Sequence, residues 1–178
     1  SKISAGASVY HLFFNEQDLV DYDTSLRFSP PLRSEEDRLG LIDAVRDGLI
    51  DVVVSSHDPQ SFLKKMVPFP LASCGAPGLK TLLPAMLRLY HEGALALSRI
   101  VEVLATRPAQ LLGISAGTLQ KGADADLLLL DLEKSWACKK GDFFAMTLAS
   151  PFKGQPFQGA IEATFKKGEK IFQASLVE

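Results

Sequence analysis

The sequence predicts an α/β protein whose final third is mostly β-structure. Over the first two-thirds of the chain, short apolar segments alternate with segments of helical periodicity. From Gly117 onward, turn-rich stretches separate apolar strands. The 178 residues, 47% of them hydrophobic and 22% charged, have an ordinary globular composition. This length allows one domain with a small appendage, and we expect two parts, residues 1–115 and residues 116–178.

Composition and patterning exclude several functional classes. The 19 Lys and Arg residues against 21 Asp and Glu residues give a formal net charge of −2, and no segment forms a basic stripe, so we expect no nucleic-acid partner. Apolar runs such as Leu127–Leu130 are too short to cross a bilayer, and the N-terminus lacks a secretory pattern, so we expect no membrane association. Cys74 and Cys138 form no CxxC pair, which predicts reduced thiols in a cytoplasmic protein.

The first elements follow from residue types and capping signals. Ile3–Phe14 is rich in β-branched and aromatic residues, which predicts a strand that ends near His11. Ser34, with Asp37 three residues later, predicts a capping box that starts a helix. The short apolar run Ile50–Val54 then predicts a strand that is buried on both faces. A polar cluster follows this strand, at the place where α/β enzymes position their functional groups.

The remaining elements are predicted from periodicity and turn residues. After an irregular loop, helical spacing covers Leu79–Tyr90 and Leu97–Leu104, and a third short helix begins near Pro108. Leu127–Leu132 is a predicted strand, and a hairpin is expected over residues 161–173 around Lys167-Gly168-Glu169.

Several motifs occur along the chain in a collinear order. They are Ser29-Pro30-Pro31-Leu32-Arg33, then Asp47–Val54 followed by His57 and Pro59, then Gly75–Pro84, Arg107–Gly113 and Gly117–Leu127. Together these motifs resemble the dihydroorotase family within the amidohydrolase superfamily, and the resemblance covers essentially the whole chain. Each motif alone is weak, and their order makes the resemblance specific.

The resemblance implies a (β/α)₈ TIM barrel with a small β-sandwich built from both chain ends. Residues 1–115 correspond to the C-terminal part of the barrel, strands six to eight, and residues 116–178 to a sandwich segment with a C-terminal hairpin. The family's HxH pair, its bridging lysine or aspartate and its strand-five histidine have no counterpart here. We therefore expect a fragment whose exposed sheet is covered by the missing N-terminal half, another copy or another protein.

The resemblance also places the site residues. His11 stands at the strand-six histidine that binds zinc in the family, and imidazole nitrogen suits Zn²⁺. Residues 55–60 align with the family sequence T-D-H-A-P-H. Ser56 replaces the aspartate that binds metal and acts as general base, and Gln60 replaces a histidine that helps hold the substrate. Two alternatives stay open: Asp58 substitutes for the lost aspartate, or the site is degenerate.

Three further positions belong to the implied substrate site. Ser29 replaces the family's asparagine before Pro-Pro. Gly75 and Gly78 bracket the loop that presents backbone groups to the pyrimidine ring in the family, although the same glycines are typical of a plain turn before a helix. Lys80 replaces the glutamate of the family's GLET sequence, and we expect His57 to be structural.

The implied reaction is the interconversion of N-carbamoyl-L-aspartate and dihydroorotate in pyrimidine biosynthesis, with a zinc-activated hydroxide as nucleophile. His11 is the one standard ligand in this chain, so we expect the chain alone to be inactive. Ser56 and Gln60 favour an alternative, in which a catalytically degenerate protein is a structural partner of aspartate carbamoyltransferase. A hydantoinase-type hydrolase of another cyclic amide is a third class, which the Ser-Pro-Pro-Leu-Arg stretch disfavours.

Overall fold

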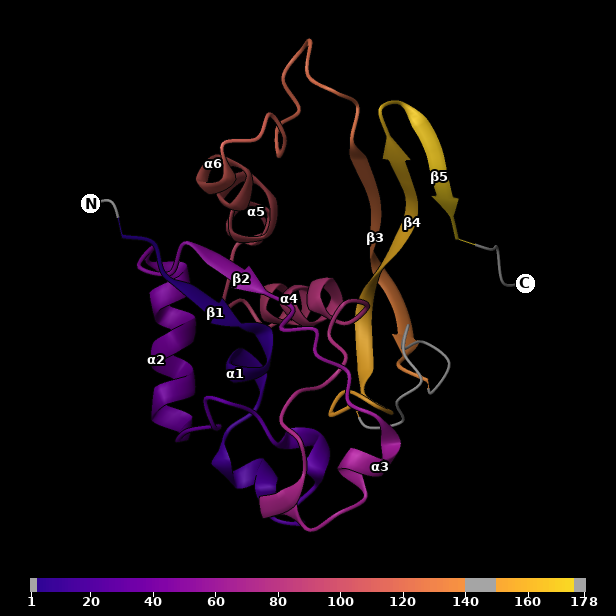
Figure 1. Ribbon diagram of the computed structural model, residues 1–178. Coiled ribbons are helices and arrows are strands. Elements are labelled where there is room, and N and C mark those ends of the chain that lie inside the picture. Colours follow the sequence, from indigo (N-terminus) through magenta and orange to yellow (C-terminus); the bar gives the residue numbers. More distant parts are fainter. Residues whose placement is uncertain (1–2, 140–149, 175–178) are drawn as a thin grey trace.

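The computed structural model describes residues 3–139 and 150–174, and it places two sheets on either side of a group of helices (Figure 1). The strands β1 (Gly6–Ser8) and β2 (Val52–Val54) form a parallel pair. The strands β3 (Leu127–Ala137), β4 (Pro156–Lys166) and β5 (Glu169–Gln173) form an antiparallel sheet in the order β3-β4-β5. The α/β class and the β-rich final third are therefore confirmed.

The parallel pair differs from the predicted doubly buried strand. Ala7 and Val53 lie opposite each other in the register and are buried, whereas Val54 is 47% exposed. Successive side chains of a strand point to opposite faces, so one face of the pair is covered and the other is open among the described residues. The expectation that Ile50–Val54 is buried on both faces is therefore wrong for this chain. The assignment to barrel strands six to eight stays a prediction.

The first strand is shorter than predicted because a helix replaces its second half. The side chain of Ser8 accepts a hydrogen bond from Tyr10 N at 3.4 Å and caps α1 (Val9–Phe13). A serine hydroxyl that satisfies a free amide at this position favours a helix start over a continued strand. His11 consequently lies inside α1 and not at the end of a strand.

The helix α2 (Glu35–Arg46) begins at the predicted capping box. Asp37 N donates to Ser34 Oγ at 3.1 Å, and Ser34 N donates to Asp37 Oδ2 at 3.2 Å. These bonds to Ser34 hold the pKa of the Asp37 carboxyl below its usual value. The two residues satisfy two free amides of the first turn, as the sequence pattern predicts.

The predicted helices after β2 are confirmed, with shifted ends and two additions. A short helix α3 (Phe62–Lys65) and a 3-10 helix over Phe69–Leu71 lie in the predicted irregular loop, and α4 (Leu82–His91) follows them. The helices α5 (Leu97–Val101) and α6 (Arg107–Leu112) are joined by a π-helical turn over Glu102–Thr106. Pro108 follows this turn and lacks the N–H that a regular α-helical ladder needs, which accounts for the local change in hydrogen bonding.

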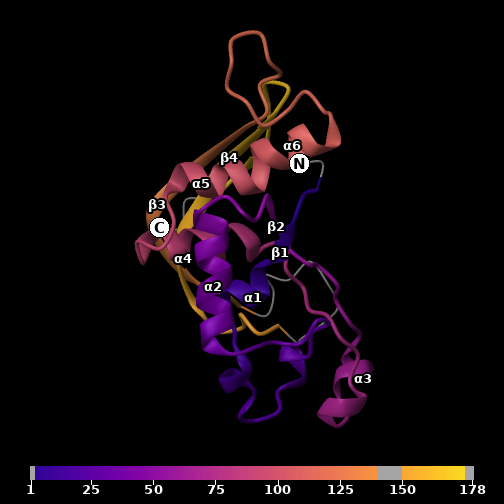
Figure 2. The same ribbon diagram turned by 90° about the vertical axis from the view of Figure 1, so that its left-hand side faces the viewer.

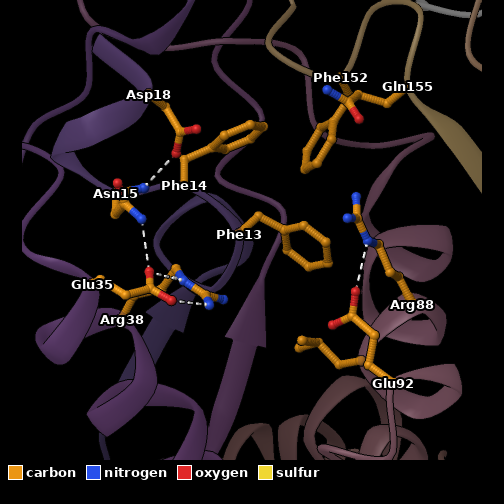
Figure 3. A pocket seen from close by; sticks show the side chains of 11 residues that line it. Phe13, Phe14, Asn15, Asp18, Glu35, Arg38, Arg88, Glu92, Phe152 and Gln155 are labelled. Carbon is orange, nitrogen blue, oxygen red and sulfur yellow. Dashed lines mark hydrogen bonds and ion pairs between the residues drawn. The ribbon is translucent and has the colours of Figure 1, made fainter. Parts of the chain in front are cut away.

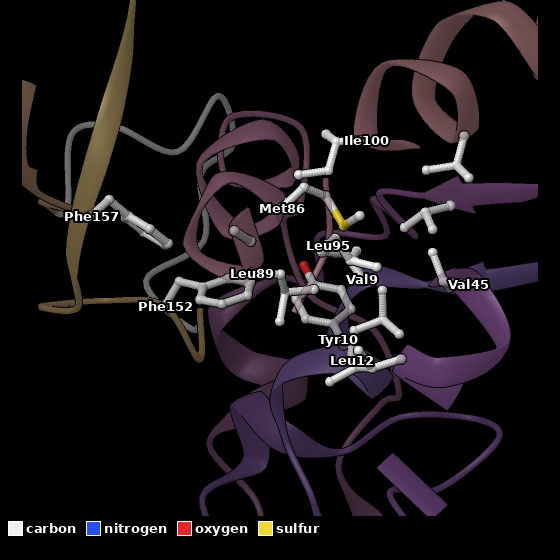
Figure 4. Close-up of a cluster of buried hydrophobic side chains, with 14 of the residues drawn as sticks. Val9, Tyr10, Leu12, Val45, Met86, Leu89, Leu95, Ile100, Phe152 and Phe157 are labelled. Carbon is white, nitrogen blue, oxygen red and sulfur yellow. The ribbon is translucent and has the colours of Figure 1, made fainter. Parts of the chain in front are cut away.

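One hydrophobic cluster connects the strands, the helices and the antiparallel sheet (Figure 4). Tyr10 lies at its centre, and its ring stacks on Phe28 at 4.5 Å and on Phe152 at 5.7 Å between ring centroids. Other members come from α2, α4, α5 and β4, and include Val45, Met86, Leu89, Ile100 and Phe157. The division between residues 1–115 and 116–178 stays a prediction, and this cluster draws on residues of both parts.

The antiparallel sheet packs against α4, as Figures 1 and 2 both show. A Cβ atom built on Gly159 of β4 would lie 2.5 Å from Leu87 Cδ1, so the sheet and the helix are in close contact there. Trp136 of β3 packs its ring against Phe157 at 5.3 Å and donates from Nε1 to Gly159 O at 3.0 Å. The sheet thus contacts the helix through close packing at Gly159, and the Trp136 hydrogen bond joins β3 to β4 beside this contact.

The predicted hairpin is confirmed, and its turn has the geometry that a two-residue connection requires. Lys167 and Gly168 join β4 to β5, with φ values of 50° and 82°. Positive φ at both positions is the type I′ turn that matches the twist of paired strands. Among residues 3–139 and 150–174, no helix has the length and apolar character to traverse a bilayer.

Candidate functional site

Three segments meet beyond the C-terminal ends of β1 and β2. They are residues 27–30, residues 55–60 directly after β2, and residues 75–79 before α4. Gly75 N donates to Arg27 O at 3.0 Å, and Asp58 N donates to Ala76 O at 3.0 Å. The sequence placed candidate residues on all three segments, and the structure brings the segments together.

The segments after β2 and before α4 run side by side. His57 and Ala76 form a parallel bridge, which extends the parallel arrangement of β1 and β2 beyond the end of β2. The side chain of His57 also takes part, because Gly78 N and Leu79 N lie 3.1 Å and 3.3 Å from His57 Nδ1. The contacts of His57 agree with the structural role expected for it, because its ring connects the segment after β2 to the segment before α4.

Gly75 and Gly78 lie where the two segments come closest. A Cβ atom on Gly78 would lie 2.1 Å from Ser55 O and 2.9 Å from Tyr10 Oη. On Gly75, which has a φ of 106°, it would lie 2.5 Å from Asp58 Oδ2. Both positions therefore require glycine for close approach within the chain, and their expected role in substrate binding stays a prediction.

His11 and Ser29 lie on the side of the site formed by residues 27–30. His11 Nε2 is 3.0 Å from Pro30 O. Because a carbonyl oxygen can only accept, Nε2 is the donor in this contact. Ser29 lines a cavity of about 320 Å³ together with Arg27 and Cys74. The predicted metal role of His11 and substrate role of Ser29 are not tested by these contacts.

The polar residues directly after β2 have distinct surroundings. Ser56 is exposed and has a φ of 45°, in the left-handed region. Asp58 is also exposed, and its Oδ1 accepts a hydrogen bond from Gln60 Nε2 at 2.7 Å. The Asp58 carboxylate thus lies between the amide of Gln60 and the backbone of Gly75. It is the carboxylate of this segment, whereas Ser56 offers a neutral hydroxyl.

The described residues do not fit a zinc site by themselves. Across residues 3–139 and 150–174, no group of three or more His, Cys, Asp or Glu side chains is arranged to hold a metal ion. A catalytic zinc ion takes three protein ligands and keeps one open position. His11 Nε2 donates to Pro30 O, and the part of the chain that the structure describes gathers no ligand set around this ring.

Sequence reasoning did not identify two residues at this site. Arg27 accepts from Gly75 through its carbonyl, and its Nη1 donates to Cys74 Sγ at 2.9 Å. Tyr10 is fully buried, its hydroxyl has no hydrogen-bond partner among the described residues, and burial raises the pKa of this phenol. Their positions depend on contacts with residues far away in the sequence, so no local pattern could have indicated them.

A separate polar cavity of about 290 Å³ lies between α1, α2 and α4 (Figure 3). Arg38 Nε and Nη2 donate to the two oxygens of Glu35 at 2.7 Å and 2.6 Å, and Asn15 Nδ2 donates to Glu35 Oε2 at 2.7 Å. The bonds from Arg38 and Asn15 lower the pKa of Glu35 to about 2. Arg88 and Glu92 form an ion pair on the opposite side.

Comparison with known proteins identifies a protein family that this chain matches. A profile of the family described as "Amidohydrolase family" matches residues 6–171. The dihydroorotase of Aquifex aeolicus is 34% identical over 173 residues, which are 97% of this chain and 40% of that protein. The dihydroorotase of Elusimicrobium minutum is 36% identical over 168 residues, or 94% of this chain and 39% of that protein.

Solved structures of hydantoinases have a similar fold. The L-hydantoinase (dihydropyrimidinase) of Arthrobacter aurescens is similar with a TM-score of 0.90 and 34% identity, over 98% of this chain and 41% of that one. A D-hydantoinase is similar with a TM-score of 0.86 and 27% identity, over 96% and 39%. The chain spans about two-fifths of the length of the curated relatives it matches.

Replacement of glycine by alanine should have opposite effects on stability at Gly78, which is crowded, and at Gly40, which is not. Gly78→Ala is expected to destabilise the chain by roughly 2 kcal/mol, because the new methyl group overlaps the Ser55 carbonyl. Gly40→Ala, in the middle of α2 with nothing within 4 Å, is expected to stabilise it by about 0.5–1 kcal/mol. Urea unfolding followed by circular dichroism measures both. Equal effects would contradict the contact at Gly78.

The lowered pKa of Glu35 predicts a pH-dependent contribution to stability. Its folded pKa of about 2 lies below the usual 4.5, so the contribution is complete above about pH 5 and is lost as the pH falls toward 2. Glu35→Gln should therefore destabilise the chain near neutral pH, and the difference from wild type should shrink on acidification. Unfolding at several pH values measures this. The control Glu36→Gln, on the same helix and exposed, should show no such trend.

Proposed function

This chain belongs to the amidohydrolase family, and from that membership we propose that it serves in the hydrolysis of cyclic amides of the dihydroorotase type. The observation that carries the proposal is similarity to dihydroorotases along 94–97% of the chain. The convergence of the three candidate segments beyond β1 and β2 supports it, because α/β enzymes place their functional groups at this edge of the sheet.

The proposed substrate pair is dihydroorotate and N-carbamoyl-L-aspartate, which belongs to pyrimidine biosynthesis. Opening a cyclic amide requires attack on the ring carbonyl and transfer of a proton to the leaving nitrogen. Asp58 is our candidate for moving that proton, since its carboxylate is exposed and is held by Gln60. Ser29, Gly75 and Gly78 are our candidates for contacting the substrate.

We propose a role for zinc only in a protein that supplies the remaining metal ligands. His11 is the residue of this chain that we assign to it, and the described residues supply no further ligand group. The other ligands would have to come from protein outside the described residues. For that reason we assign proton transfer and substrate contact to this chain, and no metal-centred step.

A second function is favoured by the residue at position 56. Ser56 is neutral at physiological pH, so it can neither accept a proton as a carboxylate does nor provide an anionic ligand. Together with Gln60 in place of a histidine, this supports a catalytically degenerate dihydroorotase-like protein. Such a protein would act as a structural partner of aspartate carbamoyltransferase.

Both functions include a partner that covers the open surfaces of this chain. Val54 on β2 is exposed, and Leu127, Leu128 and Leu129 on the edge strand β3 are 41%, 47% and 57% exposed. A long apolar edge strand is a template for pairing with another strand. We propose that the N-terminal half of an amidohydrolase fold, or another copy of the chain, covers these surfaces.

This proposal predicts that the purified chain sediments above its monomer mass of 19.3 kDa, or together with a complementary polypeptide. Leu129→Lys should reduce the association, because a charge on an edge strand opposes strand pairing. Leu63→Lys is the matched control, since Leu63 is 79% exposed but lies in α3, away from either sheet. A wild-type chain that sediments as a stable monomer would contradict the proposal.

Turnover of dihydroorotate, with a hydantoin as comparison substrate, tests the catalytic function. With zinc supplied, the chain alone should show no activity, and the assembled protein should hydrolyse dihydroorotate. If Asp58 moves the proton, Asp58→Ala should lower turnover by at least about 100-fold, whereas Asp21→Ala, an exposed acid elsewhere, should not. Ser56→Asp should then change little or reduce activity through like-charge crowding.

The degenerate alternative predicts different results for the same variants. The assembled protein should then be inactive and still bind aspartate carbamoyltransferase, and Ser56→Asp should increase metal retention in elemental analysis. Turnover by the isolated chain would show that the assignment of an incomplete site is wrong.

A further inference from the structure

His57 is the side chain that connects the segment after β2 to the segment before α4. Its Nδ1 lies within hydrogen-bond distance of two backbone amides, Gly78 N at 3.1 Å and Leu79 N at 3.3 Å. We infer that His57 is a positioning residue, which holds residues 75–79 in place as a neutral imidazole with its proton on Nε2. The link from this role to turnover rests on the proposed function, whereas the role itself does not.

The protonation state follows from the identity of the two partners. A backbone amide carries a hydrogen and can only donate, so Nδ1 must be the acceptor in both contacts. A neutral imidazole has one protonated and one unprotonated nitrogen, which leaves the proton on Nε2. His57 therefore presents an N–H donor on its other side. In this arrangement its Nδ1 is not available as a general base or as a metal ligand.

The His57 ring takes the place of the next backbone acceptor after Ala76. Asp58 N donates to Ala76 O at 3.0 Å in the parallel bridge between the two segments. In a parallel ladder alternate residues face the partner strand, so Gly78 N is the next amide that faces residues 55–60. This amide and that of Leu79 lie at His57 Nδ1, so a side chain continues the connection that the backbone began.

The same two amides lie just before α4, where free donors need partners. The first residue ahead of α4, Thr81, forms no side-chain cap, although Leu82 N donates to Gly78 O at 3.0 Å. Amides before the first helical hydrogen bonds are left without intrahelical acceptors. Gly78 is buried, so an unsatisfied amide there would be costly. His57 supplies that acceptor from a distance of 21 residues in the sequence.

This role has a consequence for the candidate site. His57 lies between Ser56 and Asp58, so the ring that fixes residues 75–79 also fixes the two residues that flank it. A side chain on Gly75 would overlap Asp58, and one on Gly78 would overlap the carbonyl of Ser55. Loss of the imidazole acceptor should therefore loosen the position of Asp58 relative to the glycine loop.

The test is to compare two substitutions that differ in where they place an acceptor. In His57→Asn the side-chain oxygen can occupy the place of Nδ1, whereas His57→Leu has no acceptor. Hydrogen exchange at Gly78 and Leu79, measured by NMR on the full chain, should be at least about tenfold faster in His57→Leu and close to wild type in His57→Asn. His91→Leu, on α4, is the matched control and should leave both amides unchanged.

The wild-type chain gives a second, independent readout. Long-range ¹H–¹⁵N correlation spectra should show His57 with its proton on Nε2. A proton on Nδ1, or equal exchange in His57→Asn and His57→Leu, would overturn the inference even if one variant folds poorly. In an active assembled protein, His57→Leu should raise the KM more than His57→Asn does. Absence of turnover would count against the proposed function alone, because the exchange and tautomer results do not depend on it.

Discussion

The approach of Gly78 to the carbonyl of Ser55 is the constraint on which the strand-end region depends. A side chain at position 78 would overlap that oxygen, so only glycine lets the segment before α4 lie against the segment after β2. This approach brings the amides of residues 78 and 79 to the ring of His57 and places Tyr10 beneath the loop. It also sets the start of α4, whose residues Met86 and Leu89 belong to the hydrophobic cluster. The absence of a side chain at position 78 therefore affects both the candidate site and the hydrophobic cluster.

Features that depend on neighbouring residues could be predicted from the sequence. The capping box of Ser34 and Asp37 and the turn at Lys167-Gly168 are set within four residues, and both occur where the pattern indicates. The glycines at positions 75 and 78 suggested a close backbone approach or a plain turn, and the contacts with Asp58 and Ser55 that require glycine could not be read from them. Features that depend on distant partners could not be predicted. They include the bond from His11 to Pro30, the exposure of Val54, and the contact of His57 with residues 78 and 79.

The replacement of the first strand's second half by α1 shows why composition alone was insufficient. Residues of high β-propensity continue to Phe14, but the Ser8 hydroxyl caps a helix at Val9. The change moves His11 from a strand end to a helix that packs beside residues 28–30. The position of His11 in α1 determines which of its contacts are possible. Asp58, the carboxylate at the strand end, accepts a hydrogen bond from Gln60 and lies against Gly75, and His11 donates to the carbonyl of Pro30.

The contact between the antiparallel sheet and α4 has an optical consequence. The chain has one tryptophan, and Trp136 lies at this contact, with its indole N–H on Gly159 and its ring against Phe157. The Nζ atom of Lys80 also lies 5.9 Å from the centre of the indole ring, from the residues just before α4. Indole emission depends on the polarity of its surroundings, so separation of the sheet from the helices would change the fluorescence of this one residue. The protein thus contains an intrinsic probe at the boundary between its helical part and its β-rich part.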